Sequence, residues 1–238
     1  MNLSVLGRCG PYPRAHEACS GYLLSSGETS ILIECGAGTL SRLRSLTELS
    51  ALDAIVLSHL HYDHCADMAI LRYALEQSSH SLLPVYCPAE PNDARAIFDY
   101  PVFQIHPLQN GMELCIGSVV FSFCSVRHPV PTFGFCAKGA GASLFYTGDT
   151  GWFEELPALV HGADALLCDC CFTDVDIDKP AIHLTARQAG ELAKQARVKT
   201  LYCTHLWGGA SDDEAILREV SFSPSVVVQE QCTYDLSS

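Results

Sequence analysis

The chain has 238 residues, of which 48% are hydrophobic, and a formal net charge of −13 at pH 7. This size and composition are typical of a globular chain with a sizeable core. The acidic balance argues against broad, sequence-independent nucleic-acid binding, which depends on clustered Lys and Arg. The first residues lack the basic and apolar regions of a signal peptide, and no apolar run approaches the roughly 18 residues of a membrane span.

The thirteen cysteines are scattered and do not have the spacing of a paired disulfide framework. Several lie in apolar, strand-like runs, where reduced cysteine behaves as a small hydrophobic residue. These are Cys87, Cys115, Cys124, Cys136 and Cys203. We therefore expect a reducing, cytoplasmic setting.

The first part of the chain alternates β-rich runs with helical segments, separated by Gly and polar turn residues. The predicted strands cover residues 3–7, 20–26, 29–35, 54–58 and 83–87. The predicted helices cover residues 38–46 and 66–77. The middle of the chain is predicted to form two hairpins, over residues 112–126 and 132–148.

After residue 150, helices and strands alternate regularly. The predicted helices cover residues 152–162, 185–196 and 211–220, and the predicted strands cover residues 163–169, 200–205 and 225–229. Two successive β-then-α halves, without a linker or a repeat, predict an α/β fold. We expect an αββα four-layer sandwich, with two mixed β-sheets flanked by helices, in one domain spanning residues 1–238.

The segment HLHYDH, residues 59–64, places His59, His61, Asp63 and His64 directly after a predicted strand. Histidine nitrogens and carboxylate oxygens suit zinc, and also manganese or iron. Alternate residues on a short extended turn can direct two imidazoles at one metal, while the Asp and the next His reach a second one. The pattern therefore predicts a metal site rather than a solvated polar loop.

Six residues cannot complete a two-metal site, so further ligands must come from other strand ends. His128 follows a predicted strand and opens HPVP, Asp149 ends another in YTGDT, and His205 ends a third in THLW. Loops at strand ends are the usual position of site residues on a rigid scaffold. We take these three as the remaining candidate ligands.

The ordered set HLHYDH, HPVP, YTGDT and THLW resembles the metallo-β-lactamase superfamily over nearly the whole chain. The resemblance implies one metal on His59, His61 and His128, and a second on Asp63, His64 and His205. It also implies that Asp149 bridges the two ions, most simply two Zn²⁺, and gives Asp63 a place among the catalytic residues. Two divalent ions about 3.5–4 Å apart can activate water and stabilise both attacking and leaving oxygens.

A second pair of residues indicates which branch of the superfamily the chain resembles. Asp169 ends the apolar run LLCD, and His183 lies just before a helix whose start is marked by the capping-box spacing of Thr185 and Gln188. A His beside a helix N-terminus is well placed to meet phosphate. The pattern resembles ribonuclease Z and its short phosphodiesterase relatives, in which an acidic residue orients a His that protonates the leaving oxygen. That acidic residue is usually Glu in ribonuclease Z, whereas Asp169 is shorter.

Only twenty residues, 129–148, separate His128 from Asp149, which leaves no room for the long tRNA-gripping arm of ribonuclease Z. The leading hypothesis is therefore a phosphodiesterase acting on a cyclic nucleotide or an oligonucleotide end by attack of a metal-held hydroxide. A tRNA 3′-processing endoribonuclease, or a hydrolase of a carboxylic ester or thioester, is the alternative. A non-enzymatic binding module is disfavoured by the complete ligand set.

Some features stay open at this level. Arg14 and His16, in a Pro-rich segment, are candidate substrate contacts or ordinary loop residues, and Trp207 either stacks on a base or packs. The cluster of Cys168, Cys170 and Cys171 fits core packing better than redox or metal chemistry. A homodimer would supply a second wall to a site that lacks the arm.

Overall fold

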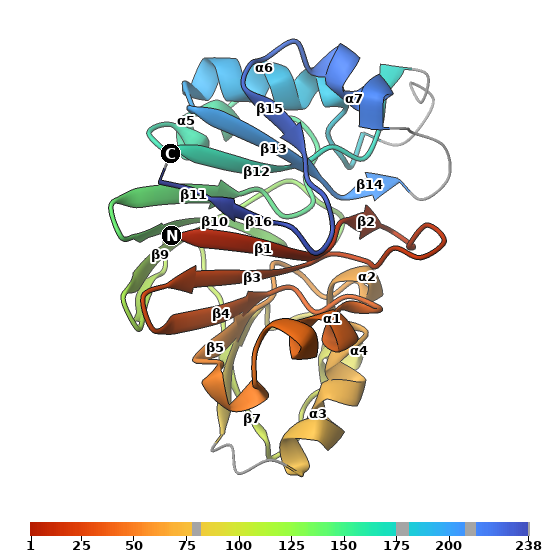
Figure 1. Cartoon of the computed structure of the whole chain (residues 1–238), viewed down its shortest axis with the longest axis vertical. Coiled ribbons are helices and arrows are strands. Elements are labelled where there is room, and N and C mark those ends of the chain that lie inside the picture. Colours follow the sequence, from red (N-terminus) through yellow and green to blue (C-terminus); the bar gives the residue numbers. More distant parts are fainter. Residues whose placement is uncertain (78–81, 175–180, 208–212, 238) are drawn as a thin grey trace.

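The computed structural model describes residues 1–77, 82–174, 181–207 and 213–237. Two seven-stranded sheets pack face to face, and helices cover both outer faces (Figure 1). This is the predicted αββα sandwich with two mixed sheets. Within the described ranges, no helix combines the length and the apolar character needed to cross a bilayer.

The first sheet has the strand order β16-β1-β3-β4-β5-β6-β7. Its strands are β1 Asn2–Gly7, β3 Gly21–Ser26, β4 Thr29–Ile33, β5 Ala54–Val56, β6 Leu83–Cys87, β7 Phe103–Pro107 and β16 Thr233–Asp235. Pairing is antiparallel from β16 to β4 and parallel from β4 to β7.

The second sheet has the order β15-β13-β12-β11-β10-β9-β8. Its strands are β8 Glu113–Ile116, β9 Val119–Ser125, β10 Phe133–Gly139, β11 Ala142–Tyr146, β12 Ala165–Asp169, β13 Thr200–Thr204 and β15 Ser225–Val227. The strands β8 to β11 form the two predicted hairpins, whereas β11, β12, β13 and β15 are parallel. The carboxyl ends of these parallel strands therefore meet at one edge.

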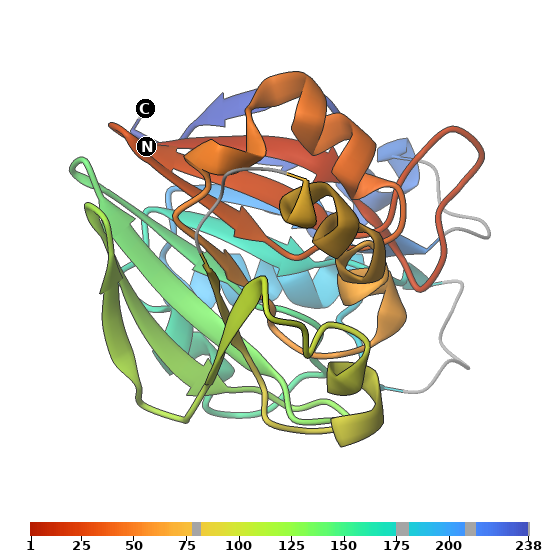
Figure 2. The same ribbon diagram turned by 90° about the horizontal axis from the view of Figure 1, so that it is seen from below.

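The helices divide between the two outer faces (Figures 1 and 2). They are α1 Thr39–Leu46, α2 Tyr62–Cys65, α3 Met68–Glu76, α4 Asn92–Ala96, α5 Leu156–Val160, α6 Ala186–Ala196 and α7 Asp213–Val220, with a 3-10 turn at Leu49–Ala51. The first four lie with the first sheet, and the last three cover the second.

The core has three layers, as this arrangement requires. The central layer fills the space between the sheets and is rich in aromatic side chains, among them Tyr22, Phe121, Phe135 and Tyr146. The two outer layers join each sheet to its helices. At about 25 cal/mol per Å² of buried apolar surface, these layers are the main favourable term in the stability of the fold.

Several short elements were not predicted from the sequence, among them the strand β7, the helix α2 and the 3-10 turn. The two-stranded parallel sheet of β2 Cys9–Gly10 and β14 Leu206–Trp207 joins the start of the chain to the segment after β13. The strand β16 is only three residues long and mostly exposed, and α4 is a single short turn. Such pieces carry too few residues for a periodic signal.

All thirteen cysteines are free thiols, which fits the predicted absence of a disulfide framework. The interpretation of Cys115 as a packed hydrophobic residue is wrong, since its side chain is exposed on the edge strand β8.

Candidate metal centre

The predicted ligands lie in segments that follow strands of both sheets, and two of them, Asp63 and His64, lie in the short helix α2. The segment His59–His64 follows β5 of the first sheet, whereas His128, Asp149 and His205 follow β9, β11 and β13 of the second. The candidate site therefore lies between the two sheets, at the end of the molecule where Figure 1 shows α2, β2 and β14.

Three imidazoles lie together beside Asp149. The ring nitrogens His59 Nε2 and His61 Nδ1 are 3.0 Å apart, and His128 Nε2 is 3.2 Å from the same His61 nitrogen. The Asp149 Oδ2 atom lies 3.6 Å from His59 Nε2 and 4.0 Å from His128 Nε2. These four residues form one group that could hold a metal ion.

A second group surrounds the other side of Asp149. The His205 Nε2 atom lies 3.2 Å from Asp63 Oδ2 and 3.3 Å from Asp149 Oδ2. The His64 Nε2 atom lies 3.4 Å from Asp63 Oδ2 and 3.2 Å from Asp149 Oδ1. All four side chains are buried, and Asp149 belongs to both groups.

The donor atoms fit divalent metal ions. A tetrahedral ion with nitrogen or oxygen ligands at 2.0–2.2 Å holds those ligands about 3.3 Å apart, close to the separations within each group. His64 Nε2 and Asp149 Oδ1 are buried without a hydrogen-bond partner, whereas His64 Nδ1 faces the Glu34 carboxylate. Because buried polar atoms are nearly always satisfied, bonds to a metal ion would account for these two atoms.

The electrostatics of the cluster also favour cations. Burial, together with the neighbouring His64, lowers the pKa of His59 well below its ordinary value, so His59 is in the neutral form that binds a metal. Burial alone would raise the pKa of Asp149, but the surrounding imidazoles of His205 and His64 outweigh it and hold that pKa well below its usual range. Asp149 is therefore ionised.

Asp169 and His183 lie together beside the second group. The Asp169 Oδ2 atom is 2.9 Å from His183 Nδ1, and both oxygens also accept backbone N–H bonds, from Thr150 and Cys171. Burial would lower the pKa of His183, but the Asp169 carboxylate more than offsets this, and the pKa is raised. His183 lies three residues before the start of α6, whose predicted capping box of Thr185 and Gln188 is present.

Asp169 also reaches a candidate ligand, because its Oδ1 lies 3.5 Å from His205 Nδ1. The thiol of Cys171 lies against the same imidazole. Cys168 and Cys170 instead pack in the core between the second sheet and its helices. The packing interpretation thus fits Cys168 and Cys170, whereas Cys171 lies at the site wall.

Two residues of the site were not singled out from the sequence. Glu34, at the end of β4, is fully buried, and its Oε1 lies 3.3 Å from His64 Nδ1. Gly10 approaches His205 so closely that an added Cβ would lie 1.9 Å from Nε2. The sequence did hold a signal for Glu34. It is a carboxylate at the end of an apolar strand, two residues before Gly36, in TSILIECG.

The candidate substrate contacts differ in position. Arg14 donates to the carbonyl of Trp207 at 3.4 Å and lies 3.6 Å from Asp213, so it lies against β14 near His205. His16 is exposed on the same loop, and its carbonyl accepts from Arg42 of α1. Among the described residues, His16 belongs to none of the metal-binding groups.

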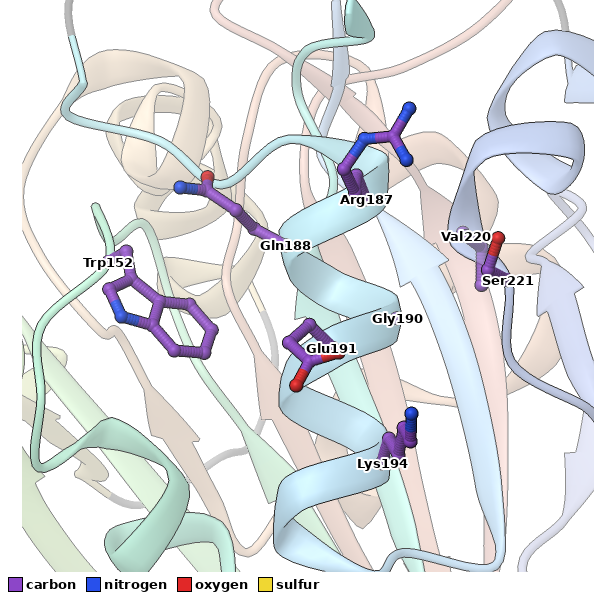
Figure 3. Close-up of a pocket in the computed structure, with 8 residues that line it drawn as sticks. All are labelled: Trp152, Arg187, Gln188, Gly190, Glu191, Lys194, Val220 and Ser221. Atoms are coloured by element: carbon purple, nitrogen blue, oxygen red, sulfur yellow. The ribbon is translucent and has the colours of Figure 1, made fainter.

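A cavity of about 440 Å³ lies on the outer face of α6, as Figure 3 shows. It is lined by Trp152, Arg187, Gln188, Gly190, Glu191, Lys194, Val220 and Ser221. The helix carries both acidic and basic groups there, and the lining contains none of the metal-binding groups. We therefore place the chemistry at the buried cluster.

Comparison with known proteins agrees with this placement. Residues 29–206 match the family model of the beta-lactamase superfamily domain. Together, the fold and the His/Asp cluster define a metallo-hydrolase. The chain belongs to the metallo-β-lactamase superfamily, as its motifs predicted.

The chain is 32% identical over 215 residues to "Probable metallo-hydrolase YhfI" of Bacillus subtilis (strain 168), covering 87% of each chain. The crystal structure of YhfI superposes with a TM-score of 0.91 at 28% identity, over 98% of this chain and 99% of that one.

The chain is also similar to proteins of the ribonuclease Z branch. It is 27% identical over 244 residues to a ribonuclease Z of Mycobacterium bovis (strain BCG / Pasteur 1173P2), covering 86% of this chain and 85% of that one. The short form of human tRNase Z shares the fold, with a TM-score of 0.79 at 21% identity over 99% of both chains.

Proposed function

We propose that the chain is a dinuclear, metal-dependent phosphodiesterase that cleaves a small or short phosphodiester, such as a cyclic nucleotide or an oligonucleotide end. The observation that carries the proposal is the 2.9 Å contact between Asp169 and His183 beside two ligand groups that share Asp149. A general acid is needed where an alkoxide leaves phosphorus, and this pair supplies one.

The ligand groups suit Zn²⁺, with Mn²⁺ or Fe²⁺ as alternatives. His59, His61, His128 and Asp149 would hold one ion, and Asp63, His64, His205 and Asp149 the other. When bound, two such ions activate water and neutralise charge on phosphoryl oxygens.

The chain's own residues are arranged to protonate the leaving oxygen. Asp169 engages Nδ1 of His183, which leaves Nε2 of the imidazole for the substrate. The Asp169 carboxylate raises the pKa of His183, which favours the protonated imidazole that a leaving oxygen would require. The N-terminus of α6, which begins at Ala186, adds favourable potential for an anion.

The second candidate is tRNA 3′-end processing, which the similarity to ribonuclease Z favours. Against it stands the interval between His128 and Asp149, most of which the tight hairpin of β10 and β11 occupies. The acidic chain, at a net charge of −13, offers little to replace an arm that grips RNA.

The test is hydrolysis of bis(p-nitrophenyl) phosphate by protein reconstituted with zinc or with manganese, against a chelated control. Metal-dependent release of nitrophenolate supports the phosphodiesterase, and cyclic nucleotides are then compared with precursor tRNA. Faster turnover of precursor tRNA would favour the second candidate. No turnover with two metals bound would contradict both and direct attention to carboxylic esters and thioesters.

A further inference from the structure

We propose that Phe172 and Trp207 form an aromatic wall of the active site that stacks on a nucleobase, so that the preferred substrates carry a base beside the scissile phosphate. This inference rests on the proposed phosphodiesterase function and extends it to the residues that select the substrate.

The wall starts at the candidate acid. The ring of Phe172 lies 5.6 Å from that of His183, and the ring of Trp207 lies 5.9 Å from that of Phe172. Both contacts are edge-to-face, with interplanar angles of 82°. The ring of Phe172 thus lies between the indole of Trp207 and the imidazole of His183. In a nucleotide, the sugar lies in the same way between the base and the phosphate. A nucleotide whose leaving oxygen meets His183 would therefore extend its base toward Trp207.

Both aromatic residues are held in place by backbone contacts. The carbonyl of Phe172 accepts from Ala186 N at 2.8 Å, at the first turn of α6, which fixes Phe172 relative to His183. Leu206 N donates to Arg8 O at 2.7 Å in the pairing of β14 with β2, and Arg14 donates to the carbonyl of Trp207. A rigid platform loses little entropy when a ligand stacks on it.

The exposure of the two rings differs as the proposal requires. Phe172 is only 9% exposed and acts as the support, whereas Trp207 is half-buried and keeps surface for a ligand. Stacking on an aromatic side chain suits every base, because every base has a π-face. Truncation of such a platform weakens base binding roughly 5- to 100-fold.

The first experiment measures binding without turnover. The chain has two tryptophans, so Trp152→Phe leaves Trp207 as the fluorophore and Trp207→Phe leaves Trp152, which lines the separate cavity of Figure 3. Each metal-loaded variant is titrated with adenosine monophosphate and with ribose 5-phosphate. We expect saturable quenching of Trp152→Phe by adenosine monophosphate alone, and none in Trp207→Phe. Equal quenching of Trp152→Phe by both ligands would overturn the proposal.

The second experiment compares substrates that share a scissile bond and differ only in a base. One pair is cyclic adenosine monophosphate and 1-deoxyribose 3′,5′-cyclic phosphate, and the other is a dinucleotide and the same compound with an abasic second residue. We expect the preference in kcat/KM for the base-bearing partner to fall roughly 5- to 100-fold in Trp207→Ala, mainly through KM, and to return in Trp207→Phe. Trp152→Ala is the matched control.

The outcomes separate this inference from the proposed function. The pair that shows the preference identifies the source of the base, a cyclic nucleotide or a chain end. If both pairs are hydrolysed without a preference for the base-bearing substrate, or if that preference is unchanged in Trp207→Ala, the proposal of an aromatic wall is wrong. The proposed phosphodiesterase function would still stand. No turnover of either pair would contradict the phosphodiesterase, and the quenching titration would then decide the wall alone.

Discussion

Glu34 Oε1 lies 3.3 Å from His64 Nδ1, and neither residue has exposed surface. The contact leaves His64 Nε2 directed at Asp63 and Asp149, in the middle of the second ligand group. A carboxylate behind a ligating imidazole fixes its tautomer and its orientation, and losing such a partner typically costs about 10- to 100-fold in metal affinity.

We therefore expect Glu34→Gln to bind the ion of the group that contains His64 about 10- to 100-fold less tightly, while the other ion is retained. The measurement is competition with a chromophoric chelator. Glu28→Gln, in the exposed turn between β3 and β4, serves as the control. Unchanged affinities for both ions in Glu34→Gln would remove the assigned role of the carboxylate.

Gly10→Ala tests the close approach of β2 to His205. The new Cβ would lie 1.9 Å from Nε2, so either the imidazole or the strand must move. We expect the bound metal per chain to fall, as measured by elemental analysis. Gly111→Ala, where an added Cβ meets nothing, should cost about 1 kcal/mol through its positive φ and keep its metal. Full metal content in Gly10→Ala would argue against His205 as a ligand.

Asp149→Ala removes the carboxylate shared by both ligand groups. We expect lower occupancy by both ions and a loss of turnover of more than about 100-fold, because each group also loses a charge partner. Metal content and hydrolysis are measured on the same preparation. A variant that keeps two ions and full rate would show that Asp149 is not the bridge.

His183→Ala should keep its metals, because the imidazole belongs to neither of the two ligand groups around Asp149. The rate should fall most for esters with poor leaving groups, which need the proton, and least for nitrophenyl esters, which do not. The check is a plot of log kcat/KM against leaving-group pKa for wild type and variant. Parallel lines would exclude a role as general acid.

The pH dependence of stability can be tested away from the cluster, at Arg8. Its guanidinium pairs with Glu17 at 2.7 Å and with Asp213 at 2.8 Å. Burial alone would raise the pKa of each carboxyl, but Arg8, together with Cys9 at Glu17 and Gln229 at Asp213, outweighs burial, and both pKa values are lowered from 4.5 and 3.8. The stabilisation is therefore full above these ordinary values and is lost as the pH falls through the lower, folded-state values.

Arg8→Met should lower the free energy of unfolding by about 2 kcal/mol at pH 7 and by much less near pH 2. Urea unfolding across that range measures the difference from wild type. Arg218→Met removes an exposed pair with Glu214 on α7 and should change little at any pH. A difference from wild type that is the same at both pH values would contradict the linkage.

The ligands could be predicted because they are concentrated in motifs. Three histidines and an aspartate within HLHYDH constrain the chemistry locally, and the ends of β9, β11 and β13 each add one residue of a matching type. The capping box marked the helix that follows His183 in the same way. The layered fold was predictable from the alternation of strand and helix patterns.

The rest of the site depends on contacts between distant segments. Gly10 and His205 are 195 positions apart, and their contact follows from the pairing of two-residue strands that carry no periodic signal. The sequence around Cys171 is typical of a core residue. In the structure, the chain turns after β12 and places the Cys171 thiol against His205. Trp207 stayed open in the sequence because stacking and packing use the same side chain, and the contact of its ring with Phe172, next to His183, joins segments far apart in the chain.

The ligands of the centre are divided between the two sheets, four after β5 and three after strands of the second sheet. Bound ions would fasten one half of the sandwich to the other, since binding to the native state alone adds to its stability by mass action. Metal starvation would then reduce the amount of this protein in the cell as well as its turnover, because a loosened chain is cleared faster by proteases. Its abundance would follow the metal supply.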